Sequence, residues 1–254
     1  MNWLLSLKDW SRRYSPFPRQ ESKLTAVKPL TALNYDEQYY REHADAGLDY
    51  LVHGYWHQSY AAMVTESTLQ STYADPFIID AGCACGSILK GFRDLALYKR
   101  VLGVDLSEHM IELGRKHFRY SKEELVPCSM ANLAVDSGSV SLLHSAQVLE
   151  HVPDELVDPI LDEFARVLRP GGRAFLCLDA VRDGETKEIY MGDPTHVNIQ
   201  PVLYWTEKLQ KRGLLFDIEA YNRFARSPRG PTAGDPRTFF QVYPYWSAWT
   251  LIRD

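Results

Sequence analysis

The spacing of apolar and polar positions changes its period near residue 77 of the chain. Residues 36–70 have helical spacing and predict a helical N-terminal extension. Beyond them, short apolar runs typical of buried strands alternate with amphipathic stretches typical of helices. Strands are predicted at 76–80, 100–105, 124–128, 139–148, 173–180, 215–222 and 245–254, and helices at 87–98, 108–118, 154–168 and 201–213. Strands that alternate with helices need crossover connections, so the pattern predicts an α/β, doubly wound, mainly parallel sheet with helices on both faces.

Local signals mark the ends of several elements. Ser107 is a natural N-cap for the helix that follows it. The run Pro170-Gly171-Gly172 predicts the end of the helix before it. Residues 223–237 are rich in proline and glycine and carry four arginines, which predicts a loop.

The chain divides into three parts: an N-terminal arm (1–34), a helical cap segment (35–74) and an α/β domain (75–254). The arm opens with apolar residues at helical spacing before prolines break the pattern. It either packs on its own domain, which we favour, or binds a partner or a membrane surface. The cap segment is dense in aromatic residues, which indicate core packing or, alternatively, a substrate-binding cap around His57.

Composition narrows the classes of function. The 254 residues carry a net charge of −5, and 45% of them are hydrophobic, which is ordinary for a globular protein. The acidic balance argues against nucleic acid as a partner, because phosphates call for a basic face. No apolar run approaches the roughly 20 residues of a membrane span. The 4 cysteines are too few for a disulfide scaffold and, with no secretory signal, predict a cytoplasmic protein with reduced thiols.

Two acidic residues end consecutive predicted strands. Asp80 precedes a small-residue turn in which Gly82 and Gly86 allow a tight bend and a close ligand approach. The spacing G-x-x-x-G differs from the G-x-G-x-x-G of dinucleotide sites, and the acid beside it would oppose a pyrophosphate. Asp105, at the end of the next strand, suits two ribose hydroxyls. The pattern therefore predicts a nucleoside ligand that lacks phosphate and carries a positive amine.

Four segments in order, FIIDAGCACG, LGVDLSEHMIELGRKHF, CSMANLAVDSGSVSLLHSAQVLEHVPDE and VLRPGGRAFLCL, resemble the class I S-adenosylmethionine-dependent methyltransferases. The resemblance covers about residues 75–215. It implies a Rossmann-like seven-stranded sheet with the last strand antiparallel, S-adenosylmethionine as cofactor, and methyl transfer as the reaction. It also makes 75–254 the methyltransferase domain.

The resemblance implies a role for each matching residue. Asp80 would hold the methionine amino group, and Asp105 the ribose. The chain departs from the family at Ala84, where a third glycine is usual, and at Ser129, where an aspartate is common. The implied cofactor-binding residues are Asp80, Gly82, Cys83, Gly86, Asp105, Leu106, Ser129, Met130, Ala131, Ala146 and Gln147.

Two histidines are candidate catalytic bases, because histidine suits proton removal from an acceptor hydroxyl. His151 follows the fourth predicted strand, and the Glu-His pair it belongs to recurs in similar methyltransferases. His196 lies after the fifth, at the same end of the sheet. Asp193 and His196 alone are thin support for a metal site, so no metal is predicted. His144 is predicted to be structural, while arginines between 223 and 237 either bind an acidic substrate or face solvent.

The leading hypothesis is a methyltransferase that acts on an oxygen or nitrogen of a small molecule, such as a sugar or a secondary metabolite. The alternatives are a protein methyltransferase and a non-catalytic methyltransferase-like subunit that activates a partner. A homodimer also stays open. Asp80 and Asp105 together argue against the non-catalytic alternative, because a decayed site would not need both.

Overall fold

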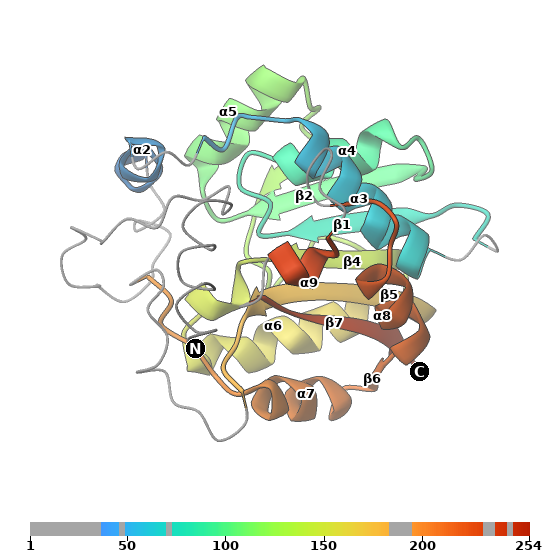
Figure 1. Cartoon of the computed structure of the whole chain (residues 1–254). Coiled ribbons are helices and arrows are strands. Elements are labelled where there is room, and N and C mark those ends of the chain that lie inside the picture. Colours follow the sequence, from blue (N-terminus) through green and yellow to red (C-terminus); the bar gives the residue numbers. More distant parts are fainter. Residues whose placement is uncertain (1–36, 46–48, 70–72, 183–194, 231–236, 243–245) are drawn as a thin grey trace, which may run out of the picture.

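The computed structural model describes residues 37–45, 49–69, 73–182, 195–230, 237–242 and 246–254. The arm (1–34) and Asp193 lie outside these residues. A seven-stranded sheet in the order β3-β2-β1-β4-β5-β7-β6 forms its centre (Figure 1). The five strands from β3 to β5 are parallel to their neighbours, whereas β7 is antiparallel to both β5 and β6. The predicted mainly parallel sheet with an antiparallel last strand is confirmed.

The bounds of the elements agree with most of the predicted ranges. The strands are β1 (Phe77–Ala81), β2 (Arg100–Asp105), β3 (Leu125–Pro127), β4 (Val140–Ala146), β5 (Leu168–Asp179), β6 (Leu214–Phe216) and β7 (Trp246–Arg253). The helices are α2 (Glu37–Asp45), α3 (Tyr55–Thr68), α4 (Ser87–Asp94), α5 (Glu108–Phe118), α6 (Asp154–Val167), α7 (Val202–Gln210), α8 (Ile218–Ala225) and α9 (Phe239–Val242), and a 3-10 turn, η2, spans Leu149–His151.

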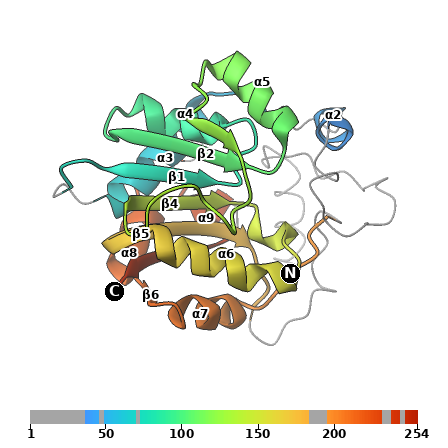
Figure 2. The same cartoon turned by 180° about the vertical axis from the view of Figure 1, so that it is seen from behind.

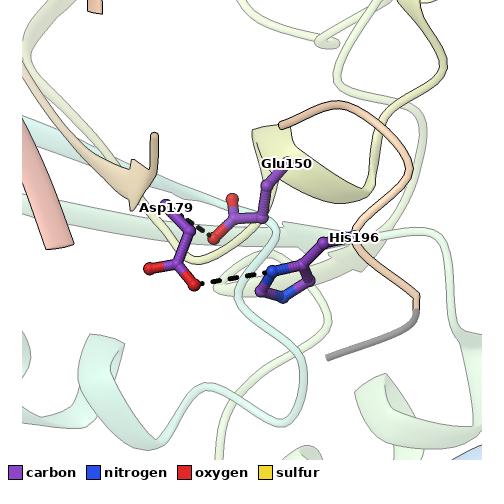
Figure 3. Close-up of side chains that lie close together, drawn as sticks. All are labelled: Glu150, Asp179 and His196. Carbon is purple, nitrogen blue, oxygen red and sulfur yellow. Dashed lines mark hydrogen bonds and ion pairs between the residues drawn. The ribbon is translucent and has the colours of Figure 1, made fainter. Parts of the chain in front are cut away.

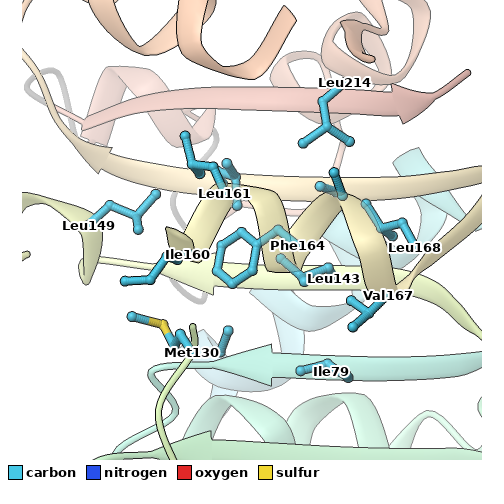
Figure 4. Close-up of a cluster of buried hydrophobic side chains, with 14 of the residues drawn as sticks. Ile79, Met130, Leu143, Leu149, Ile160, Leu161, Phe164, Val167, Leu168 and Leu214 are labelled. Carbon is cyan, nitrogen blue, oxygen red and sulfur yellow. The ribbon is translucent and has the colours of Figure 1, made fainter. Parts of the chain in front are cut away.

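Helices cover both faces of the sheet. Figure 1 shows α3, α8 and α9 in front of it, and Figure 2, from behind, shows α6 across the opposite face. Under α6, a buried cluster joins Phe164 and Leu161 to Leu143 of β4 and Leu214 of β6 (Figure 4). Each such side chain contributes roughly 1.5–3 kcal/mol by leaving water. This packing holds the carboxyl ends of the parallel strands in fixed positions.

Several predicted boundaries differ from the structure, and two of them lie furthest from it. The sixth predicted strand, 215–222, is a strand only as far as Phe216, because Asp217 caps a new helix by accepting a hydrogen bond from the Ala220 amide at 2.9 Å. The strand predicted to begin at residue 173 begins at Leu168 instead. Helix α6 ends before Pro170, as predicted, but the chain passes directly into β5, so Pro170 lies in a strand. Ser107 is confirmed as an N-cap, since its side chain accepts a hydrogen bond from the Met110 amide.

Among the described residues, no helix is long and apolar enough to cross a membrane.

Candidate functional site

The turn after β1 has the backbone conformation that its small residues predict. Gly82, Ala84 and Gly86 have φ values of 78°, 47° and 79°, in the left-handed region. The amides of Gly82 and Cys83 donate to the Val104 carbonyl at 2.8 and 3.0 Å, which ties the turn to β2. A Cβ on Gly82 would lie 2.5 Å from a Val148 methyl, so glycine is required there. Ala84 holds a conformation that costs an L-residue about 1 kcal/mol or more.

Asp105 ends β2 beside this turn. One carboxylate oxygen accepts a hydrogen bond from the Ala84 amide at 2.8 Å, and the other accepts one from the Ser107 amide at 2.9 Å. Burial raises the pKa of this carboxyl above its ordinary value, and the backbone amides oppose that rise. Each oxygen keeps a lone pair for a further donor. Leu106 next to it is 44% exposed, so an apolar surface lies beside the carboxylate.

Asp80 lies one strand away, in β1, and is 3% exposed. Its Oδ1 is 2.7 Å from Nδ1 of His144 on β4, and Nε2 of that ring is 3.0 Å from the hydroxyl of Tyr60 on α3. His144 is buried, as a structural role predicts, but it also contacts a predicted cofactor residue. Asp80 and Asp105 therefore flank the same turn from two neighbouring strands.

The loop after β3 carries the residues predicted at the adenine. The Cys128 amide donates to the Asp105 carbonyl at 2.9 Å, which holds this loop against β2. Ser129 Oγ accepts a hydrogen bond from the Ala131 amide at 3.2 Å. Met130 is buried and packs into the core under α6 (Figure 4), while Ala131 is half-buried. The Met130 side chain therefore anchors this loop to the core.

The loop after β4 approaches the turn from the other side. Gln147 follows Ala146 with φ at 57°, and its amide donates to the Cys177 carbonyl at 2.7 Å. Its Nε2 is buried and has no hydrogen-bond partner among the described residues. A buried donor without a partner costs about 1–3 kcal/mol. A polar ligand that accepts from Gln147 would remove that cost, so this donor fits a cofactor with a carboxylate end.

Cys83 lies in this turn and is buried. Burial raises the pKa of its thiol well above the ordinary value, so it stays protonated.

A second group of polar side chains lies at the ends of β4 and β5. Asp179 Oδ2 is 3.5 Å from Nδ1 of His196, and Glu150 Oε1 accepts a hydrogen bond from the Asp179 amide at 3.2 Å (Figure 3). All three side chains are at least nine-tenths buried. Burial, and then the neighbouring Asp179, raise the pKa of Glu150 well above its ordinary value. Glu150 therefore holds a proton where an exposed carboxyl would be ionised.

The two candidate bases are in contact. The rings of His151 and His196 meet edge to face with their centroids 4.4 Å apart, and His151 Nδ1 lies 3.1 Å from the Thr195 hydroxyl. The Asn198 amide donates to the Glu150 carbonyl at 2.9 Å, which anchors the His196 segment on η2. The structure thus brings together two histidines that lie far apart in the sequence.

Sequence reasoning missed Glu150 and Asp179. A signal for Asp179 was present, since it is an acid at the carboxyl end of a strand, as Asp80 and Asp105 are. Glu150 stands beside the predicted His151, but only the fold shows that it faces Asp179. One ligand atom each from Glu150, Asp179 and His196 lie within 4.8 Å of one another, so these residues could also hold a divalent cation.

Other candidates lie apart from this site. Arg223 donates to the Ser67 carbonyl, and Arg229 pairs with Glu66. Together with Arg226, Arg223 lines a pocket of about 450 Å³ between α3 and α8, which contains none of the predicted cofactor or catalytic residues. His57 is half-buried, and burial lowers its pKa to about 4, so it is neutral near neutral pH.

Known proteins resemble this chain over its central region. Residues 79–176 match the family described as methyltransferase domain. The chain is 30% identical over 132 residues to demethylmenaquinone methyltransferase of Symbiobacterium thermophilum, covering 49% of this chain and 48% of that protein. It is also 30% identical over 102 residues to ubiquinone biosynthesis O-methyltransferase of Xanthomonas oryzae, covering 39% of this chain and 41% of that protein. The chain thus spans under half the length of these relatives.

A solved structure extends the likeness to the fold. Geranyl diphosphate C-methyltransferase of Streptomyces coelicolor, in complex with Mg²⁺, geranyl-S-thiolodiphosphate and S-adenosyl-L-homocysteine, superposes with a TM-score of 0.55 at 18% identity. The superposition covers 76% of this chain and 75% of that one. The chain therefore contains a class I S-adenosylmethionine-dependent methyltransferase domain, matched at 79–176.

Proposed function

We propose that the protein transfers the methyl group of S-adenosylmethionine to an oxygen of a small-molecule acceptor. The observation that carries the proposal is the buried Asp179–His196 pair, with Glu150 beside it, at the carboxyl ends of the parallel strands, where Asp80 and Asp105 also lie. An acceptor hydroxyl keeps its proton near neutral pH and needs a base, whereas a free amine does not. The pair therefore favours oxygen over nitrogen.

The residues present fit the cofactor. Asp105 offers two oriented oxygens to ribose hydroxyls, and Leu106 offers an apolar surface to adenine. Asp80 would bind the amino group, and Gln147 Nε2 the carboxylate. When bound, S-adenosylmethionine supplies an activated methyl group on a sulfonium, whose leaving group is a neutral thioether. The protein is then left to orient the acceptor and exclude water, which together supply up to about 7–11 kcal/mol in well-aligned reactions.

His196 is the base of this proposal. Asp179 Oδ2 lies 3.5 Å from Nδ1 of the ring, and Nε2 is the atom to which the proposal assigns the acceptor proton. The carboxylate fixes the tautomer and stabilises the imidazolium that forms, as in other acid–histidine pairs. Protonated Glu150 can donate to the acceptor oxygen or to Asp179. His151 packs edge to face on His196 and restricts its ring, which makes it a positioning residue or a second base.

A methyl-transfer assay with matched variants tests the proposal. Purified protein is incubated with methyl-deuterated S-adenosylmethionine and a panel of phenols, sugars, carboxylates and amines, and mass spectrometry detects the labelled product. We expect transfer to hydroxylated compounds, and we expect His196→Gln to lower kcat by about 10²–10⁴-fold with unchanged cofactor affinity. His109→Gln, on α5, is the control. Methyl transfer to amines alone, or a lower affinity of His196→Gln for S-adenosylmethionine, would contradict the role of His196.

The alternatives give different results in the same assay. A protein methyltransferase would label protein substrates in an extract and none of the small molecules. A non-catalytic subunit would bind S-adenosylmethionine without transfer to any acceptor. The names of the relatives, which include an O-methyltransferase, support a small-molecule acceptor.

A further inference from the structure

A hydrogen-bonded chain of three buried side chains runs from α3 to the strand that ends beside the cofactor turn. The Tyr60 hydroxyl lies 3.0 Å from His144 Nε2, and His144 Nδ1 lies 2.7 Å from Asp80 Oδ1. Tyr60 and His144 are fully buried, and Asp80 is 3% exposed. Polar groups that are buried this deeply cost stability unless they are paired. Here both ring nitrogens of His144 have a hydrogen-bond partner.

The three residues come from separate elements. Asp80 and His144 are register partners across the parallel pair β1–β4, which brings their side chains together on one face of the sheet. Tyr60 lies on α3, which precedes the matched methyltransferase domain at 79–176. Helix α3 packs closely on α4, because a Cβ on Gly91 would lie 2.6 Å from the His57 carbonyl oxygen. The helix outside the matched domain is therefore held firmly against it.

Aromatic side chains fix the His144 ring. The ring stacks on Phe175 with an interplanar angle of 15° and a centroid distance of 6.1 Å, and Phe92 lies 5.1 Å from it on a tilted plane. With the ring confined, the neutral tautomer that satisfies both partners donates from Nδ1 to Asp80 and accepts at Nε2 from Tyr60. Asp80 Oδ1 is thereby held in one position, and the carboxylate plane is fixed with it.

We propose that His144 and Tyr60 are positioning residues for the amino group of the cofactor, which act through Asp80. This inference rests on the proposed function, in which Asp80 binds that amino group. A carboxylate that is already oriented loses little rotational freedom when the ligand binds, so the affinity for the amino group is higher. The inference makes α3 part of the cofactor-binding machinery.

Two ligands separate positioning from general stability. S-adenosylhomocysteine carries the amino acid portion, whereas 5′-methylthioadenosine has the same adenosine and thioether but lacks it. Isothermal titration with each ligand gives, for every variant of the full chain, the ratio of the affinity for S-adenosylhomocysteine to the affinity for 5′-methylthioadenosine. A merely structural role would change the two affinities together, whereas loss of Asp80 positioning changes only the affinity for S-adenosylhomocysteine.

The variants differ in which hydrogen bond they remove. His144→Leu removes both, and we expect S-adenosylhomocysteine to bind about tenfold more weakly with 5′-methylthioadenosine within about twofold. His144→Asn keeps a donor near the Nδ1 position and should restore the ratio to within about threefold. Tyr60→Phe should lower the ratio by about threefold. Tyr98→Phe is the control, because Tyr98 is half-buried and its hydroxyl lies 2.9 Å from the Thr65 hydroxyl on α3, the helix that carries Tyr60.

Asp80→Asn keeps the two proposals apart. If Asp80→Asn leaves the ratio unchanged, its proposed role at the amino group is wrong, and the positioning role falls with it. If Asp80→Asn lowers the ratio but His144→Leu does not, only the positioning role is overturned. Should His144→Leu fail to fold, Tyr60→Phe decides: a ratio equal to that of Tyr98→Phe overturns the inference, and a lower ratio supports it.

Discussion

Replacement of Asp105 by asparagine removes the charge that the ribose hydroxyls would meet. Its two oxygens already accept from the Ala84 and Ser107 amides, so the carboxylate is fixed before any ligand arrives. Asparagine keeps one acceptor oxygen, and its amide nitrogen cannot accept from the second backbone donor. A hydrogen bond to a charged group contributes about 1.5–3 kcal/mol. If one hydrogen bond from a ribose hydroxyl to the charged carboxylate is lost, ligand binding should weaken by about 2 kcal/mol, or roughly thirtyfold.

Isothermal titration with S-adenosylhomocysteine measures this loss directly. Glu108→Gln is the matched control, because it removes the same charge three positions away on the first turn of α5. The thermal unfolding temperature of Asp105→Asn should also fall, since one backbone amide loses its acceptor. An affinity of Asp105→Asn within twofold of the unmodified protein would refute the assignment of Asp105 to the ribose.

Three further predictions concern stability, pH and metal. Ala84→Gly should raise the free energy of unfolding by about 0.5–1 kcal/mol, because it relieves the left-handed φ of 47°. Denaturant titration measures this change, with Ala61→Gly on α3 as a control that should be less stable than the unmodified protein. A loss of stability in Ala84→Gly would contradict the prediction. The fold raises the pKa of Glu150 above its ordinary value of 4.5, so this group stabilises the fold fully below pH 4.5 and loses that effect as the pH rises toward its native pKa. As the pH rises above 4.5, Glu150→Gln should therefore lose less stability than the unmodified protein, and an equal loss in both would refute the raised pKa. Dialysis against EDTA should leave methyl transfer unchanged, because a neutral thioether leaving group needs no Lewis acid. If activity is lost and Mg²⁺ or Mn²⁺ restores it, a metal would be assigned to Glu150, Asp179 and His196 instead.

Local sequence was sufficient for the elements whose signals are short-range. Strands β1 and β2 lie within one residue of their predicted ranges, because unbroken apolar runs end in an acid and a turn. The cap at Ser107 is equally local. The stretch after Phe216 was misread, because a single aspartate that caps a helix is hard to distinguish from a polar position within an alternating strand.

The polar contacts of the site depended on distant parts of the chain. Tyr60 and His144 are 84 positions apart, and His144 and Asp80 are 64 apart, so only the pairing of β1 with β4 and the packing of α3 bring them together. The same holds for Asp179 and Glu150. A motif can predict which residues meet a cofactor, but the partners that orient them follow from tertiary packing.

The most direct test of the central claim is a crystal structure of the protein with S-adenosylhomocysteine bound. We predict the ribose hydroxyls on Asp105, the amino group on Asp80 and the sulfur directed toward His196. A ligand bound elsewhere, or one whose ribose and amino group meet neither aspartate, would contradict the account.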